Sequence, residues 1–163
     1  MNNVNQKIKG SNNQQTVQIF NRPIDVVDIC ADKIKTILEN ISSIDFLASG
    51  NQKLIPPNIP KKNLINNIDN ANSLEIEKTY ARWDEITETI SSDVSGHLEK
   101  SYQMSAYILN QSYLSLSEYD FPKFKINAIQ TYCQNTKASL DEAFVFTHLL
   151  HYMYLNCQLG VKP

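Results

Sequence analysis

Glycine and cysteine are scarce in this chain of 163 residues, and their distribution excludes several kinds of site. The four glycines are dispersed, so no glycine-rich loop can cradle a phosphate, which excludes a P-loop nucleotide site. The three cysteines, Cys30, Cys133 and Cys157, are odd in number and far apart, so they imply no disulfide framework. We expect them to be buried thiols in a reducing compartment.

A strong net charge is also lacking. The 15 basic and 17 acidic residues leave a net charge of -2, which gives no global field for attracting nucleic acid or an anionic membrane. The N-terminal stretch MNNVNQKIKG has no apolar core of a secretory signal. We therefore expect a cytoplasmic protein whose partners are neither nucleic acid nor membrane.

The longest apolar stretch, SLDEAFVFTHLLHYMYLNCQLG at residues 139–160, predicts the central helix of the fold. Ser139 and Glu142 have the spacing of a capping box, and Gly160 is suited to end the helix. Apolar residues fill nearly all its faces, which is typical of a buried helix. A membrane span is not expected, because charged and polar residues interrupt the run and no basic flank follows it.

Helical periodicity recurs along most of the preceding chain. It predicts helices over 23–48, 61–69, 72–90, 98–116 and 123–137. Three prolines interrupt the pattern between the first two, and Ser91 to Gly96 predict a kink or a restart. In the short helix 61–69 we expect Leu64, Ile65 and Ile68 to face inward, and in the next we expect Asn72 to be the N-cap. The fold class predicted is all-α: a single-domain bundle of about five or six helices around the buried C-terminal helix, over residues 22–163.

Residues 1–21 form a polar, Asn/Gln-rich segment with two interpretations. Such a tract buries too little apolar surface to order itself, which favours a flexible tail. The alternation in IKGSNNQQTVQIF also fits a short strand or hairpin that pairs with another chain. In that case Val17, Ile19 and Phe20 would belong to an oligomerisation or docking segment.

Residues capable of chemistry are few and form no recognised motif. His148 and His151 lie on one side of the C-terminal helix with Cys157 beyond them, but structural zinc requires four ligands. An enzyme or metal protein built on these three residues remains a minor hypothesis; we expect two core histidines with hydrogen-bond partners, and no metal, cofactor or catalytic residue. The carboxylates between Glu75 and Glu88 alternate with Lys78 and Arg82, as on a solvated helix face.

Aromatic residues provide the candidates for a partner surface, because tyrosine, tryptophan and arginine dominate protein interfaces. The candidates are Tyr80, Trp83, Tyr102, Tyr107 and Tyr113. Core packing is the alternative explanation and should apply to about half of them.

Three stretches carry a resemblance to a known family. They are LIPPNIPKKNLINNID, the tyrosine-rich helices from about Glu75 to Leu116, and the terminal HLLHYMYLNCQLG. Together they resemble the C-terminal domains of bacterial ABC-three-component systems, the antiphage defence operons related to Lamassu, over about residues 23–163. The resemblance implies a helical docking module that ties an effector to an ATPase and a middle component. Only some twenty polar residues precede the domain, so we expect a subunit that acts in trans or an excised domain.

The function predicted from these observations is a non-enzymatic interaction and assembly module of a bacterial defence complex. Its partners would be operon-encoded subunits or further copies of itself. The alternative is a small helical antitoxin, immunity or inhibitor protein that occludes its target.

Overall fold

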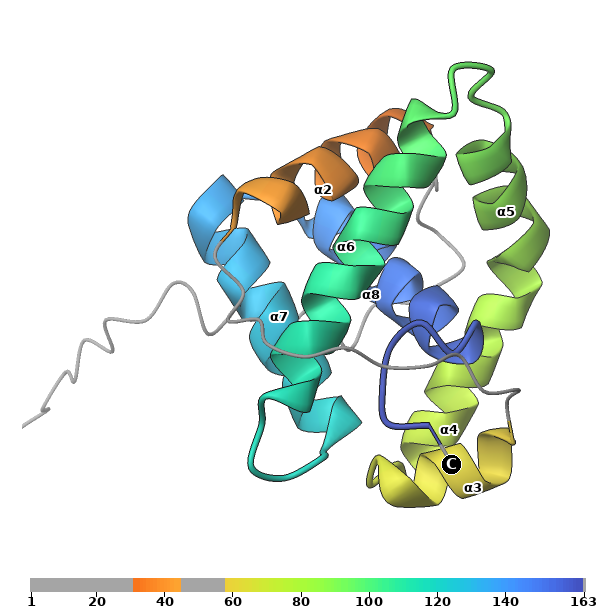
Figure 1. Ribbon diagram of the computed structural model, residues 1–163, viewed down its shortest axis with the longest axis vertical. Coiled ribbons are helices and arrows are strands. Elements are labelled where there is room, and N and C mark those ends of the chain that lie inside the picture. Colours follow the sequence, from red (N-terminus) through yellow and green to blue (C-terminus); the bar gives the residue numbers. More distant parts are fainter. Residues whose placement is uncertain (1–30, 45–57, 163) are drawn as a thin grey trace, which may run out of the picture.

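The computed structural model describes residues 31–44 and 58–162, which form helices joined by turns, with no strand among them (Figure 1). The helices are α2 (Ala31–Ser43), α3 (Ile59–Ile65), α4 (Asn70–Glu77), the 3₁₀ helix η2 (Lys78–Arg82), α5 (Trp83–Ser91), α6 (His97–Leu114), α7 (Phe121–Thr136) and α8 (Leu140–Leu155). Because α4, η2 and α5 follow one another without a gap, they form one bent helix, and the described chain then has six helices. The prediction of an all-α domain is confirmed.

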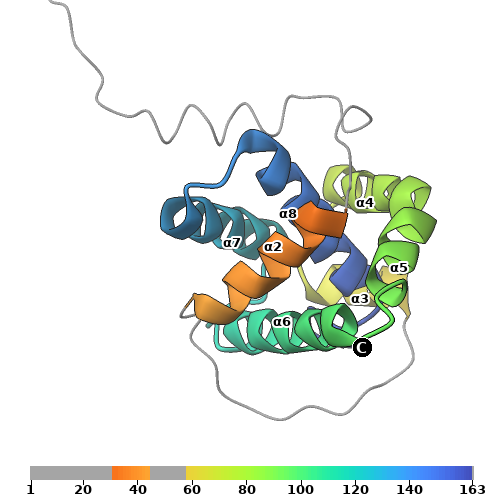
Figure 2. The same ribbon diagram turned by 90° about the horizontal axis from the view of Figure 1, so that it is seen from above.

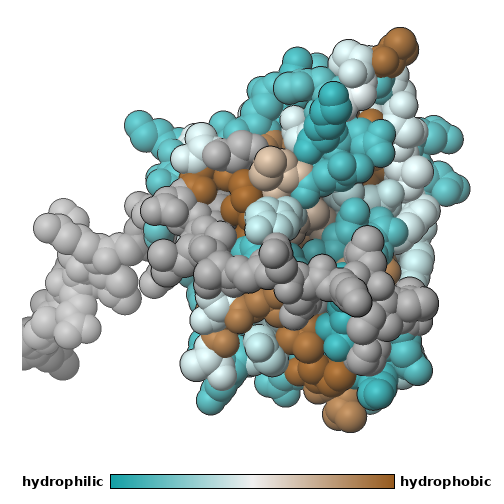
Figure 3. Space-filling model, viewed as in Figure 1, coloured by the Kyte–Doolittle hydropathy of each residue, from teal (hydrophilic) through white to brown (hydrophobic). Residues whose placement is uncertain are grey.

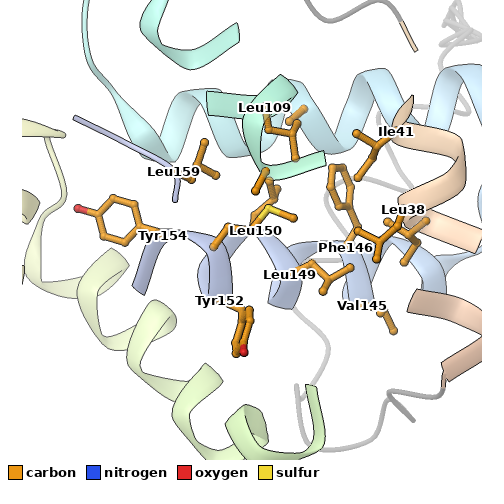
Figure 4. Close-up of a cluster of buried hydrophobic side chains, with 14 of the residues drawn as sticks. Leu38, Ile41, Leu109, Val145, Phe146, Leu149, Leu150, Tyr152, Tyr154 and Leu159 are labelled. Atoms are coloured by element: carbon orange, nitrogen blue, oxygen red, sulfur yellow. The ribbon is translucent and has the colours of Figure 1, made fainter. Parts of the chain in front are cut away.

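Helix α8 lies at the centre of the bundle, with α2, α6, α7 and the bent helix around it (Figure 2). Every residue from Ala143 to Leu155 is buried, which confirms the prediction of a buried C-terminal helix. Figure 4 shows its side chains reaching in several directions, for example Phe146 and Tyr152 from different sides of the helix. Side chains on all sides of α8 therefore pack against the rest of the domain.

The ends of α8 agree only in part with the prediction. Ser139 accepts a hydrogen bond from the Glu142 N–H and the Glu142 side chain accepts one from the Ser139 N–H, so the capping box is confirmed. The helix ends at Leu155, however, and not at Gly160. Asn156 is its C-cap, Cys157 takes a positive φ of 57°, and the chain then forms a turn of residues 156–162, here called the C-terminal turn.

Helix α3 is present, but its orientation differs from the prediction. Lys62 is fully buried, whereas Leu64 is 81% exposed and Ile65 is only partly buried. The helix has seven residues, about two turns, so its own apolar pattern is too short to fix its rotation. Contacts with the C-terminal turn fix it instead.

The bent helix starts and bends at places that the sequence only partly indicated. Asp69, and not Asn72, is the N-cap of α4: its carboxylate accepts a hydrogen bond from the Asn72 N–H at 2.8 Å. The predicted break between residues 91 and 96 is confirmed, with Gly96 at a φ of 65° directly before α6. The 3₁₀ turn η2 within the predicted helix 72–90 was not expected.

Three predictions remain: they concern the N-terminal docking segment, the burial of the cysteines and a membrane span. The N-terminal segment with Val17, Ile19 and Phe20, and also Cys30, lies outside the described residues. Of the other cysteines, Cys157 is buried and Cys133 is partly buried. Within the described ranges, no helix has the length and apolar character needed to cross a membrane.

Candidate functional site

The two histidines of α8 meet the bent helix at a single threonine. The Thr79 hydroxyl of η2 lies 3.1 Å from His148 Nδ1 and 3.2 Å from His151 Nδ1, and all three residues are buried. A hydroxyl has one hydrogen, so it donates to one ring and accepts a hydrogen bond from the other. Thr79 thus connects both rings to the bent helix.

The unpaired ring nitrogen of His151 indicates which atoms of this cluster carry protons. His151 Nε2 is buried without a hydrogen-bond partner. A neutral His151 that carries its proton on Nδ1 and donates it to Thr79 leaves no N–H unpaired, and Thr79 then donates to His148. Burial lowers the pKa of His151 well below 6.5, and the positive charge of Lys125 lowers it further. His151 is therefore a neutral ring of the core.

A second buried polar contact lies beside the histidines. The Lys125 ammonium of α7 lies 2.7 Å from Glu75 Oε2 of α4, and the Lys125 side chain is only 4% exposed. The prediction that the carboxylates from Glu75 to Glu88 form a solvated face is therefore wrong for Glu75, which pairs with a residue fifty positions away. It holds for Glu85, whose carboxylate pairs with Arg82 at 2.7 Å.

The third buried polar cluster holds the C-terminal turn. The Lys62 ammonium donates to the Tyr154 carbonyl and lies 3.8 Å from the centre of the Tyr154 ring. Burial lowers the pKa of Lys62 from 10.5 to about 8, while the neighbouring Cys157 side chain opposes the shift. Lys62 thus caps the C-terminal end of α8, where the carbonyl groups lack intrahelical partners.

Two asparagines complete this attachment. The Asn66 side chain accepts from the Val161 N–H at 2.7 Å and donates to the Val161 carbonyl at 2.9 Å. The Asn110 side chain of α6 accepts from the Gly160 N–H at 3.0 Å. The C-terminal turn is therefore joined by hydrogen bonds to both α3 and α6.

These clusters offer little for catalysis or metal binding. Each polar group in them is engaged with another protein group or enclosed by the core, and no three metal-ligating side chains converge within the described residues. Burial raises the pKa of the Cys133 thiol, which disfavours the reactive thiolate. The arrangement is suited to holding helices together.

The predicted interface aromatics separate into two groups. Tyr80 is 53% exposed, Tyr107 is 52% exposed and Trp83 is partly buried. Tyr102 and Tyr113 lie in the core, where burial raises the pKa of both phenols. Tyr102 packs on Tyr152 of α8, and Tyr113 packs on Phe121 and Phe124 of α7, so neither tyrosine can be part of a partner surface.

The exposed aromatics also differ in how they are supported. The rings of Tyr80 and Trp83 lie 5.8 Å apart at 32°, and Trp83 packs on Tyr152 at 4.4 Å. Tyr152 is held in turn by the Thr87 hydroxyl at 2.9 Å. We call Tyr80 and Trp83 the aromatic corner. Among the described residues Tyr107 has no such ring contact.

Residues of structural importance that the sequence did not reveal are Thr79, Lys62 and Asn66. None of them belongs to a motif, and a polar residue in an apolar helical pattern normally indicates the solvent side. By contrast, the burial of Tyr102 and Tyr113 could have been predicted, because both occupy the apolar stripe that begins at Leu98 of α6.

The fold and its buried polar contacts define an all-helical domain built around a fully enclosed C-terminal helix. The sequence matches the family model of C-terminal domain 12 of the ABC-three component systems over residues 13–160. The chain belongs to this family, and the resemblance predicted from the sequence is confirmed. Neither the curated proteins nor the solved structures include a significant match.

Proposed function

We propose that this domain is a non-enzymatic docking module that acts in the cytoplasm and binds the other protein components of an ABC-three-component defence complex. The observation that carries the proposal is the family match over residues 13–160, because a domain of a multicomponent system works beside protein partners. The match includes nearly the whole described domain, so the proposal applies to the bundle and not to one motif.

The way the domain uses its polar groups supports a role without catalysis. Catalytic groups act from a cleft where they meet a substrate and usually leave some hydrogen-bonding capacity free. Here Thr79, Lys62 and Lys125 each form contacts between helices inside the core. These groups stabilise the bundle, which leaves binding to its outer surface.

The outer surface carries the side chains expected of a docking module. Large apolar or aromatic side chains are more than half exposed on α4, η2 and α6: Leu74, Tyr80, Met104 and Tyr107. Figure 3 shows apolar patches on one face of the molecule. Exposed aromatic side chains of this kind are enriched at the centres of protein interfaces.

Co-expression of the chain with the other components encoded beside it tests the proposal. An affinity tag on this chain should retain at least one component through size-exclusion chromatography, and light scattering should give the mass of a defined complex. The purified chain alone serves as the reference for self-association. A monomer that retains none of the other components would overturn the proposal.

A further inference from the structure

The aromatic corner is rigidly supported from the core, whereas the equally exposed Tyr107 has no ring contact among the described residues. Tyr80 and Trp83 are three residues apart across the 3₁₀ turn, and with three residues per turn such positions lie one above the other. Trp83 is backed by Tyr152, which Thr87 holds by a hydrogen bond. A partner that binds here would not have to immobilise the tryptophan, which lowers the entropic cost of association.

The charges around the corner have one dominant sign. Residues 77–88 carry four carboxylates against two basic groups. Arg82 is engaged by Glu85 through two hydrogen bonds, at 2.7 and 3.2 Å. Asp84 and Glu88 are exposed and, within the described part of the chain, have no ion-pair partner. The corner is therefore bordered by carboxylates that no described residue of the domain neutralises.

The placement of these carboxylates has a cost in the isolated domain. Asp84 and Glu88 are four residues apart on one helix, a spacing at which like charges repel. Glu88 also lies near the C-terminal end of α5, where the helix dipole disfavours a negative charge and where no basic residue compensates. A cationic group bound between them would remove both penalties.

We propose that the aromatic corner is the docking surface of this domain and that its partner presents a segment containing arginine or lysine. A guanidinium or ammonium group can stack on the Tyr80 and Trp83 rings while it pairs with Asp84 and Glu88. The inference rests on the proposed function, since it names the surface and the partner chemistry for the same docking role.

Two exposed tyrosines give a matched test. Tyr80→Ala should weaken binding of the co-expressed component by about tenfold or more, as expected for an interface hot spot. Tyr107→Ala removes an equally exposed tyrosine from α6 and should leave binding unchanged. Loss of binding in Tyr107→Ala together with full binding in Tyr80→Ala would overturn the assignment.

Charge is tested separately. The double variant Asp84→Lys/Glu88→Lys should abolish binding, while Glu99→Lys, an exposed charge reversal on α6, should not. If the double charge reversal lowers the thermal midpoint of unfolding, the neutral variant Asp84→Asn/Glu88→Gln is used in its place. This variant removes both carboxylates without adding a repulsive charge, and it should still weaken binding. Raising the salt concentration from about 0.05 to about 0.5 M should weaken the wild-type complex and affect the neutral variant much less.

A direct readout is available because Trp83 is the single tryptophan of the chain. Tryptophan-free peptides that tile the other components are titrated into the full chain, and peptides that shift Trp83 fluorescence should contain arginine or lysine. Binding only by acidic or uncharged peptides would overturn the inference, as would a homodimer that Tyr80→Ala dissociates. If a complex forms and none of these variants weakens it, the aromatic corner is not the docking surface, although the docking function stands. If no complex forms, both proposals fail.

Discussion

Replacing Gly160 with alanine should destabilise the domain much more than the same replacement at Gly96. Both glycines have a positive φ, 95° at Gly160 and 65° at Gly96, a conformation that costs an L-residue about 1–2 kcal/mol. The backbone penalty is therefore similar at the two positions. The difference lies in what surrounds the added methyl group.

The space around Gly160 is already filled. A Cβ there would lie 2.9 Å from a Tyr154 ring carbon, 3.1 Å from Asn66 Oδ1 and 3.2 Å from Lys62 Cε. These neighbours cannot move freely, because Asn66 makes two hydrogen bonds with Val161 and Lys62 bonds the Tyr154 carbonyl. Overpacking of this kind costs about 1–3 kcal/mol, so Gly160→Ala should lose about 2–5 kcal/mol in total.

Gly96 provides the control because a Cβ there meets no atom within 4 Å. Gly96→Ala should lose only the backbone term of about 1–2 kcal/mol. Urea unfolding followed by circular dichroism gives both values from the midpoint, provided that the slope of the transition is unchanged. An equal or smaller loss at Gly160 would show that the C-terminal turn is not packed against α3 as described.

The buried polar groups give three more predictions. Thr79→Val should lose about 2–3 kcal/mol in urea unfolding, since it leaves buried nitrogens of His148 and His151 without a partner. The pKa of His151 is held below 6.5 by burial, so only the unfolded chain binds its proton just below pH 6.5. The free energy of unfolding should have its full value above pH 6.5 and should decrease by up to about 1.4 kcal/mol per pH unit below pH 6.5. His151→Gln should flatten this slope. For Lys62 the pKa falls from 10.5 to about 8 on folding, so unfolding measurements should show stability rising from about pH 8 to about pH 10, a rise that Lys62→Met should lack.

The threonine and histidine predictions each have an internal control. Thr89→Val changes a threonine of α5 whose side chain makes no hydrogen bond to any described residue, and it should cost little. His97→Gln, at an exposed position, should leave the slope below pH 6.5 unchanged. A wild-type protein whose stability is flat between about pH 5 and pH 7 would contradict a neutral, buried His151.

The parts of the fold that could be predicted from the sequence depend on local signals. The capping box of Ser139 and Glu142 lies within four consecutive residues, and the apolar content of α8 identifies a buried helix without reference to other segments. The break at Gly96 is likewise a local property. These features do not depend on which segments meet in the folded state.

The features that were not predicted depend on contacts between residues that are far apart in the sequence. Lys62 is buried because α8 ends above it, 92 residues later in the chain, and Glu75 pairs with Lys125 across fifty residues. Thr79 reaches the histidines because a 3₁₀ turn departs from the 3.6-residue period that the sequence pattern assumes. In each case tertiary structure determines the direction of a side chain, and a local pattern does not contain that information.

The 3₁₀ turn connects the core to the proposed docking surface through two consecutive residues. Thr79 is buried against the histidines of α8, while Tyr80 is 53% exposed. The hydrogen bonds of Thr79 therefore fix the turn that presents Tyr80 and positions Trp83. Thr79 is not at the surface, so any effect of Thr79→Val on partner binding would have to act through the turn, as a loss of rigidity in the aromatic corner. One segment thus has two roles: its buried side sets the geometry of the turn, and its exposed side presents the proposed docking residues.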